Sequence, residues 1–389
     1  MKKSLLALAV TGAFAGAAQA QSSVTVYGLY DGGQNILKVK ETSTAGAVTE
    51  SQSGGFSGNA SASSRIGFRG TESLNSDLSA TFNFELAITP GSGVLNTTSG
   101  TTAATNANAS AAPRTSTLGL VSKSLGSLQI GRATTGVHGV VAGDVWGGNN
   151  MVGDMVYSSF TSTTTTAPNN ISQVNDVSGR VSNMFTRIDN LVAYTTPTFM
   201  GANLRLDYAN NTLTSDGYAG IQTALQGATL SYNWKQFTVK AATANTRYNE
   251  AQAATAVFTG KKTTINAANA MFKQGPVTLQ YTFAINKDET VITGAQNFKV
   301  KAQKLSASYQ VTPQIMGFVQ YGNGGTQMTN LASAANNQTN DTAMQIGAEY
   351  SMSKRTNLYA AYGSQERKRI NTTAKAEMDQ YAFGVRHTF

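Results

Sequence analysis

The sequence has no cysteine, few charged residues and only 6 prolines. The lack of cysteine excludes a disulfide framework, thiolate chemistry and cysteine-ligated metals. Charged residues make up 13% of the 389 residues, whereas about 25% is typical of soluble domains. After the first twenty residues no run of about 20 apolar residues occurs, so we expect no transmembrane helix.

Catalytic and ligand-binding motifs are missing as well. The sequence contains no G-x-S-x-G, H-E-x-x-H or G-x-x-x-x-G-K-[ST] motif, which would indicate a serine hydrolase, a zinc protease or a P-loop protein. Its two histidines, His138 and His387, are far apart in the sequence, whereas a metal site needs clustered ligands. We therefore expect no enzymatic activity and no cofactor or metal.

The formal net charge is +9, and the Lys and Arg residues are scattered rather than gathered in one run. A basic excess is compatible with nucleic acid, an acidic surface or an anionic solute as the partner. The scattered arrangement favours a positive field inside the molecule, and we expect no nucleic-acid partner.

The first twenty residues have the pattern of a signal peptide. Lys2 and Lys3 precede a short apolar stretch, and Ala18-Gln19-Ala20 is an A-x-A cleavage site. We expect cleavage between Ala20 and Gln21, so that residues 1–20 are removed. Residues 21–389 are then expected to form a single exported domain.

Alternation of apolar and polar residues is the main signal in the rest of the chain. It is clearest in residues 229–235, 277–285, 304–311 and 344–352. Successive side chains of a strand point to opposite faces, and in a membrane barrel one face meets lipid while the other meets water. With 38 glycines and little charge, this pattern predicts an all-β protein that spans a membrane as a barrel.

The connections between the predicted strands are of two kinds. The seven short turns are at residues 72–77, 124–127, 196–201, 235–236, 273–276, 311–314 and 353–355. The eight longer connections are near residues 38–58, 89–113, 133–178, 210–224, 246–262, 286–298, 323–341 and 366–376. Together they predict a 16-stranded antiparallel transmembrane β-barrel with short periplasmic turns and long external loops. Sixteen strands leave an aqueous channel, whereas about eight can be filled by side chains.

The chain ends on an alternating strand in which Tyr381, Phe383, Val385 and Phe389 share one face. This strand is expected to pair with the first one, because an unpaired edge in lipid is very costly. We interpret Phe389 as a C-terminal assembly signal, read by the barrel-assembly machinery during insertion.

Alternation also assigns side chains to the lumen. Ile66 and Phe68 must face lipid, because an Arg at mid-depth costs roughly 2–4 kcal/mol, so Arg65 and Arg69 face inward. The same argument turns Glu85 inward on the following strand. Tyrosines near the inferred strand ends are expected to form a belt at the membrane interface, namely Tyr27, Tyr194, Tyr208, Tyr281 and Tyr359.

Several stretches carry a resemblance that covers the whole mature chain. They are S-S-V-T-V-Y-G at 22–28, S-R-I-G-F-R-G at 64–70, R-I-D-N at 187–190, S-K-R-T-N-L-Y at 353–359 and R-H-T-F at 386–389. In these motifs the sequence resembles the trimeric general porins of β-proteobacteria. The resemblance implies a homotrimer and a third external loop folded into the pore. It also implies a constriction in which Arg65, Arg114 and Arg187 on the wall oppose acidic residues.

The candidate constriction residues are Arg65, Arg69, Arg114, Arg132 and Arg187 on the basic side and Glu85, Asp144 and Asp154 on the acidic side. Because rings of Arg or Lys favour anions, we expect a water-filled channel for passive diffusion of small hydrophilic solutes and ions, with a mild anion preference. The alternatives are a solute-specific anion channel for phosphate or organic acids, a structural or adhesive barrel, and a soluble secreted β-protein. Outer-membrane lipids and lipopolysaccharide are the expected surroundings of the barrel.

Overall fold

The computed structural model describes residues 23–58, 60–90, 94–95, 113–142, 144–146, 187–210, 223–248, 262–289, 296–330, 336–370 and 372–389. The predicted signal peptide, its cleavage site at Ala20 and Gln21, and the candidate residue Asp154 lie outside these ranges. None of the helices in the described ranges is long and apolar enough to cross a membrane.

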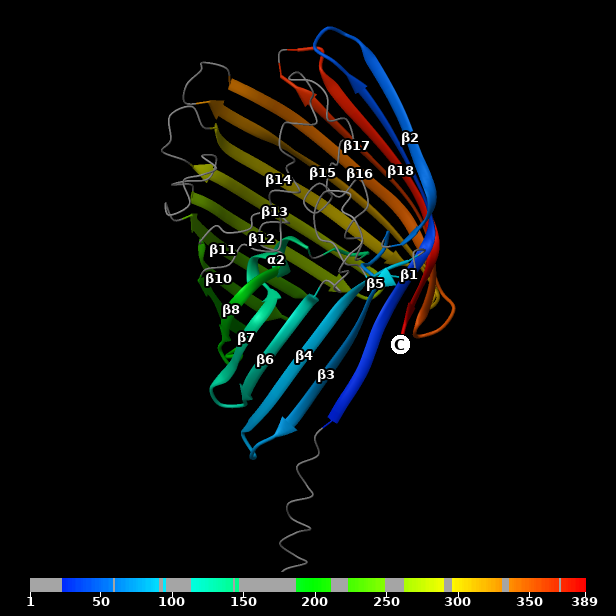
Figure 1. The fold of residues 1–389 in the computed structure, drawn as a ribbon. Coiled ribbons are helices and arrows are strands. Elements are labelled where there is room, and N and C mark those ends of the chain that lie inside the picture. Colours follow the sequence, from blue (N-terminus) through cyan, green and yellow to red (C-terminus); the bar gives the residue numbers. More distant parts are fainter. Residues whose placement is uncertain are drawn as a thin grey trace, which may run out of the picture.

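The described residues form one continuous antiparallel sheet and a short helix (Figure 1). The helix is α2 (Gly136–Val141). The first strands are β1 (Ser23–Thr42), β2 (Val48–Gly58), β3 (Arg65–Ser73), β4 (Leu78–Thr89), β5 (Val94–Leu95), β6 (Pro113–Ser122), β7 (Gly126–Thr134), β8 (Arg187–Thr195) and β9 (Ala202–Asn210). The others are β10 (Thr223–Trp234), β11 (Phe237–Tyr248), β12 (Lys262–Gln274), β13 (Val277–Glu289), β14 (Gln296–Gln310), β15 (Ile315–Asn330), β16 (Asn336–Ser351), β17 (Thr356–Arg369) and β18 (Lys375–Thr388).

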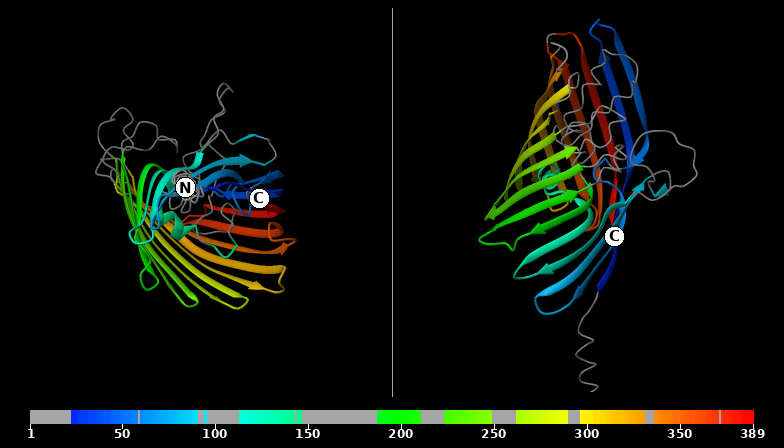
Figure 2. Two further views of the ribbon diagram at one scale, coloured as in Figure 1. Left: turned by 90° about the horizontal axis from the view of Figure 1, so that it is seen from below. Right: turned by 60° about the vertical axis from the view of Figure 1, so that its left-hand side comes forward.

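These strands make a closed barrel with sixteen strand positions around its wall, each of which we call a stave, as predicted from the sequence. The first half of β1 pairs with β3 and its second half with β2, so β2 and β3 together form one interrupted stave. The two-residue β5 pairs only with β4 and adds no stave. β1 also pairs with β18, which closes the ring (Figure 2, left).

The seven short turns lie where alternation places them, but the strands at the other end of the barrel are longer than predicted. β1 runs to Thr42 and β2 starts at Val48, although residues 38–58 were expected to be a loop. β15 and β16 likewise extend into the predicted loop at 323–341. The physical reason is that polar residues and glycines predominate on both faces of these extensions, so regular alternation disappears while the hydrogen-bonded ladder continues.

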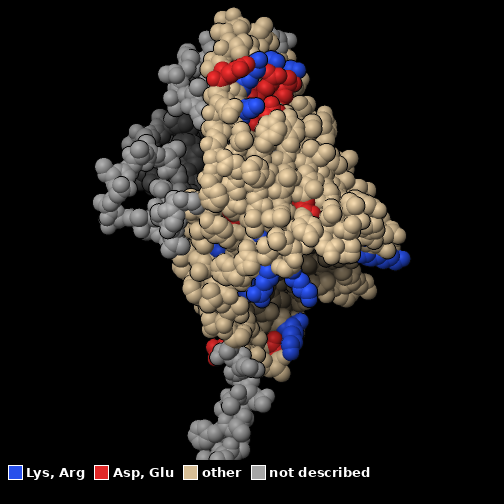
Figure 3. Space-filling view, turned by 90° about the vertical axis from the view of Figure 1, so that its right-hand side faces the viewer, with Lys and Arg blue, Asp and Glu red and all other residues tan. Residues whose placement is uncertain are grey.

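Side chains alternate between the two faces of the wall. On β14 Leu305 is 58% exposed on the outer face, whereas its neighbour Ser306 is 1% exposed. On β16 Ile346 is 51% exposed and Gln345 is buried. On the face of the barrel that Figure 3 shows, a broad band has few charged side chains, as expected of a surface that meets lipid.

The third external loop begins at the end of β7 and turns into the barrel, as predicted. Its first part is α2, which contacts the inner side of β9, β10, β11, β12 and β13. Val137, Val140 and Val141 of α2 are buried there against Leu191 and Ile265. This apolar contact holds the helix against one part of the wall, and the opposite part of the wall faces the lumen (Figure 2).

Candidate pore constriction

Arg65, Glu85 and Arg114 form an ion-pair cluster on the inner face of β3, β4 and β6. Arg114 Nε lies 2.6 Å and Arg65 Nη1 3.9 Å from Glu85 Oε1. The side chains of Glu85 and Arg114 are 11% and 12% exposed, whereas that of Arg65 is 27% exposed. Two guanidinium groups thus share one carboxylate, and the cluster keeps an excess of positive charge.

Tyr27 of β1 covers this cluster. Its hydroxyl lies within hydrogen-bonding distance of Asn83 Oδ1 (2.8 Å) and of Glu85 Oε2 (3.1 Å). Gly67 is in register with Tyr27, and a Cβ at Gly67 would overlap the tyrosine ring. The guanidinium carbon of Arg69 lies 5.0 Å from the centroid of the same ring, a cation–π arrangement. Arg69 therefore adjoins the predicted basic wall through Tyr27.

The expected interface belt is wrong for two of its five tyrosines. Tyr27 points inward because Val24 and Val26 occupy the outer face of β1. Tyr359 is buried, and its hydroxyl donates a 2.6 Å hydrogen bond to Asp31 Oδ1. The other three predicted tyrosines lie on the outer face, namely Tyr194, Tyr208 and Tyr281.

A buried carboxylate fixes the start of α2. Thr135 is the N-cap, and its hydroxyl accepts a hydrogen bond from a backbone N–H of the first turn. Asp207 Oδ2 accepts a 2.6 Å hydrogen bond from Gly136 N. Asp207 Oδ1 accepts a 2.8 Å hydrogen bond from Arg205 Nε. Alternation predicts that Arg205 and Asp207 face inward, but nothing in the sequence shows that they hold the third loop.

His138 of α2 links the helix to two of the predicted arginines. Burial, and then the positive charges of Arg187 and Arg114, lower the pKa of His138 from its usual 6.5 to about 3. The imidazole is therefore neutral at ordinary pH. Both arginines therefore lie close enough to His138 for their charges to act on it.

Beyond α2, the third loop is held against the wall at two further points. Asp144 Oδ2 lies 3.7 Å from Lys304 Nζ, and both side chains are buried. Asp144 is therefore engaged by the wall beside β14, rather than facing the arginines as expected. Its position follows from Trp146, two residues later, which is buried against the same side of the barrel.

Trp146 is the main anchor of the described part of the loop. Its ring stacks on Phe318 with centroids 4.4 Å apart and meets Tyr359 edge-on at 5.8 Å. Its Nε1 donates a 2.9 Å hydrogen bond to Glu349 Oε1, which also lies 2.9 Å from a nitrogen of Arg386. The described part of the loop thus contacts the wall from β9 to β17.

Arg132 belongs to a different environment from the other candidate arginines. Arg132 Nη1 lies 2.7 Å from Asp189 Oδ1, at an irregularity in the pairing of β7 with β8. The flanking residues Ala133 and Ile188 are buried in the cluster beneath α2, so alternation turns Arg132 and Asp189 to the other face of the wall. The structure therefore does not bring Arg132 to Glu85.

Comparison with known proteins identifies the family. Residues 6–370 match the sequence profile of the Gram-negative porins. The chain belongs to the Gram-negative porin family. This membership confirms the prediction of a pore-forming outer-membrane protein rather than an enzyme. Among the described residues no group of three or more His, Asp and Glu side chains could hold a metal ion.

Relatives of this porin include proteins of known name and structure. It is 32% identical over 216 residues, 54% of its length, to an outer membrane porin protein of Bordetella pertussis. It is 48% identical over 86 residues, 22% of its length, to outer membrane porin protein 32 of Delftia acidovorans. The alignments span 48% and 22% of these two relatives.

The fold agrees with solved porin structures. The anion-selective porin from Comamonas acidovorans superposes over 95% of this chain and 100% of its own, with a TM-score of 0.65 and 21% identity. A trimer form of OmpT from Vibrio cholerae superposes over 95% of this chain and 99% of its own, with a TM-score of 0.61 and 14% identity.

Proposed function

We propose that this porin forms a water-filled channel for passive diffusion of small hydrophilic solutes and ions, with a mild preference for anions. The observation that carries the proposal is the cluster of Arg65, Glu85 and Arg114, in which one carboxylate serves two guanidinium groups. Arg69, beside the ring of Tyr27, supports the proposal with a further positive charge next to this cluster.

The acidic side of the constriction is weak in the described part of the loop. Asp144 is paired with Lys304, so its charge is compensated at the wall. A unit charge about 5 Å from a permeating ion changes the energy of that ion by roughly 0.8 kcal/mol in water. Uncompensated arginines at this distance lower the energy of anions and raise that of cations, which favours anions.

The proposal is tested by reversal potentials in a salt gradient, measured on the mature protein in planar bilayers. Replacing Arg114 by Gln should lower the anion-to-cation permeability ratio about fivefold at 0.1 M salt, where the Debye length is about 10 Å. Replacing Glu85 by Gln should raise the ratio. Arg355→Gln, in the exposed turn between β16 and β17, removes the same charge away from the cluster and should leave the ratio unchanged.

A clear cation preference of the wild-type channel would overturn the anion proposal, and a barrel that does not conduct would favour a structural or adhesive role. Saturable block by low concentrations of phosphate or an organic acid would instead favour the solute-specific alternative.

We further propose that the protein is a homotrimer, inserted by the barrel-assembly machinery and surrounded by outer-membrane lipids and lipopolysaccharide. The trimer form of a structurally similar porin supports the oligomeric state. Three equal closing steps per insertion event in the same recordings would agree with a trimer, whereas single steps would contradict it.

A further inference from the structure

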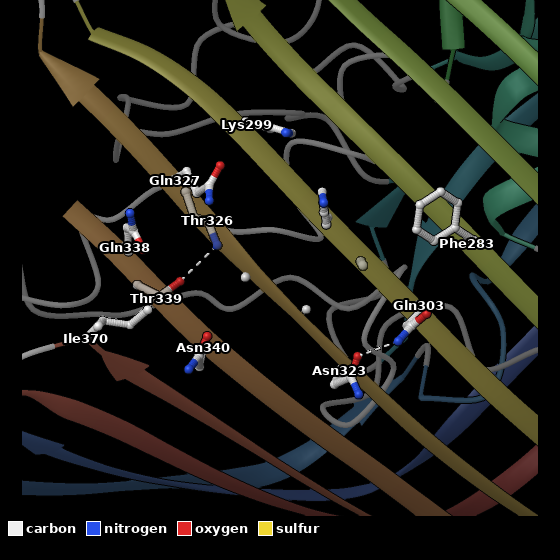
Figure 4. A pocket seen from close by; sticks show the side chains of 14 residues that line it. Phe283, Lys299, Gln303, Asn323, Thr326, Gln327, Gln338, Thr339, Asn340 and Ile370 are labelled. Atoms are coloured by element: carbon white, nitrogen blue, oxygen red, sulfur yellow. Dashed lines mark hydrogen bonds between the residues drawn. The ribbon is translucent and has the colours of Figure 1, made fainter. Parts of the chain in front are cut away.

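A groove opens on the outer face of the wall, at the external end of β14, β15 and β16 (Figure 4). Its volume is about 430 Å³, and no carboxylate is present among the described residues that line it. The lining side chains that matter here are Phe283, Lys299, Lys301, Gln303, Asn323 and Asn340. Lys301 and Gln303 precede the lipid-facing Leu305 on β14 by four and two residues, which places them on the outer face.

The groove results from a local opening between β15 and β16. Their pairing runs as far as Gly324 with Asp341 and resumes only at Gln327 with Gln338. In between, Thr326 N donates a 3.1 Å hydrogen bond to a side-chain hydroxyl of β16 instead of to a backbone carbonyl. Gly325 adds no side chain to the outer face, so the hollow stays open between Lys301 and Asn340.

The surface around the groove changes from apolar to basic along the strands. Tyr281, Leu305 and Tyr321 lie in register and form an exposed apolar row. Six residues further toward the external end, the corresponding row contains Lys287 and Lys299. At about 3.3 Å per residue this is a distance of roughly 20 Å along the strands. The groove therefore straddles the boundary between the lipid-facing band and the external head-group region.

Three lysines lie close together at the groove, and their mutual repulsion favours binding of an anion. Lys287 and Lys299 are directly opposite each other on neighbouring strands, and Lys301 lies one row below on the same face. Like charges directly opposite each other destabilise a sheet. None of the three makes an ion pair with any residue that the structure describes. A bound anion would relieve this repulsion.

The other flank of the barrel compensates its lysines internally. Lys40 lies in register with both Glu50 and Glu377, and its Nζ is 2.9 Å from Glu50 Oε1. Lys375 and Lys368 lie opposite each other, and each forms an ion pair with a glutamate two residues away on its own strand, Glu377 at 3.0 Å and Glu366 at 2.8 Å. Figure 3 shows the resulting mixture of positive and negative side chains near the top of the molecule. Among the described ion pairs, none therefore neutralises the lysines at the groove, whereas those of this flank are neutralised.

We infer that this groove binds the phosphate groups of a glycolipid in the outer leaflet of the membrane. The ammonium groups neutralise phosphate, and the carboxamides of Gln303, Asn323 and Asn340 offer donors and acceptors to phosphate and sugar oxygens. Phe283 and the apolar rows below it accept the acyl chains. The inference rests on the outer-membrane location of the barrel and is independent of its ion selectivity.

The test uses native mass spectrometry of the detergent-purified mature protein with two probes, bisphosphorylated lipid A and the same lipid after removal of both phosphates. Wild-type protein should bind the phosphorylated probe at least tenfold more tightly than the dephosphorylated one. The variant K287Q/K299Q/K301Q should lose at least tenfold in affinity for the phosphorylated probe. If this variant does not fold, Lys299→Gln alone should still weaken binding about threefold.

The matched control is K40Q/K368Q/K375Q, which removes the same three charges from the compensated flank and should bind the phosphorylated probe within twofold of wild type. Equal losses in both triple variants, or equal binding of the two probes by wild type, would overturn the inference. Conductance and reversal potential should be unchanged in the groove variant, so failure of lipid binding and failure of the channel proposal give different results.

Discussion

Replacing Asp207 by Ala should loosen the third loop from the wall. In the native protein the two oxygens of Asp207 accept hydrogen bonds from Gly136 N at 2.6 Å and from Arg205 Nε at 2.8 Å. The Asp207 side chain is 2% exposed, so water does not replace these bonds easily. The substitution leaves the first N–H of α2 and one guanidinium nitrogen without their acceptor.

The size of the effect follows from these contacts. A hydrogen bond to a charged group contributes about 1.5–3 kcal/mol, and breaking it leaves a buried donor unsatisfied. Arg205 is one quarter exposed and keeps a second bond to the carbonyl of Thr134, so we take about 2 kcal/mol for the whole substitution. Since about 1.4 kcal/mol corresponds to a factor of ten, the population with α2 displaced should rise about thirtyfold.

Single-channel recordings measure this population as the frequency of brief conductance changes at constant voltage. Asp207→Asn keeps an acceptor oxygen and should give an intermediate frequency. Asp379→Ala is the control, because Asp379 also accepts a 2.6 Å hydrogen bond, from Tyr362, but on the outer side of the external rim. A folded Asp207→Ala channel with the wild-type frequency would refute the assignment of Asp207 as the anchor of the loop.

Two further predictions concern the constriction. The pKa of His138 is lowered to about 3 while the loop is seated against the wall, so between pH 6.5 and 3 only the displaced loop binds a proton at this residue. Acidification should therefore favour the displaced loop by up to about tenfold per pH unit. This pH dependence should vanish in His138→Asn, and an unchanged dependence in that variant would contradict the prediction. Gly67→Ala should push the Tyr27 ring away from Glu85, and unchanged reversal potential and conductance would show that Tyr27 has no part in the constriction.

The barrel was predictable because one physical rule acts along every stave. A side chain that faces lipid must be apolar and one that faces water is polar, so the sequence of each strand that crosses the membrane alternates with a period of two residues. The rule no longer applies once a strand leaves the lipid. For this reason the external ends of β1, β2, β15 and β16 were expected to be loops, although their backbone hydrogen bonds continue.

The candidate site was predictable only in part, and for a related reason. Alternation assigns a face to Arg65 and Glu85, and would also have placed Tyr27 inward had it been applied from Val24 and Val26. It gives no information about the partner across the lumen. The contact of Trp146 with Glu349 joins residues 203 positions apart, and it depends on the path of a loop that has no period at all.

The seam of the barrel shows how a feature visible in the sequence determines one that is not. Phe389 exchanges two backbone hydrogen bonds with Gly28, at 3.0 and 3.1 Å, and this pairing sets the register between β1 and β18. In that register Asp31 lies opposite Arg386, and Asp31 accepts the hydroxyl of Tyr359 from the next strand. A shift of one residue would turn Asp31 toward lipid. The terminal phenylalanine therefore has a structural consequence beyond its predicted part in assembly, because the buried network beside Trp146 exists only in the register that it fixes.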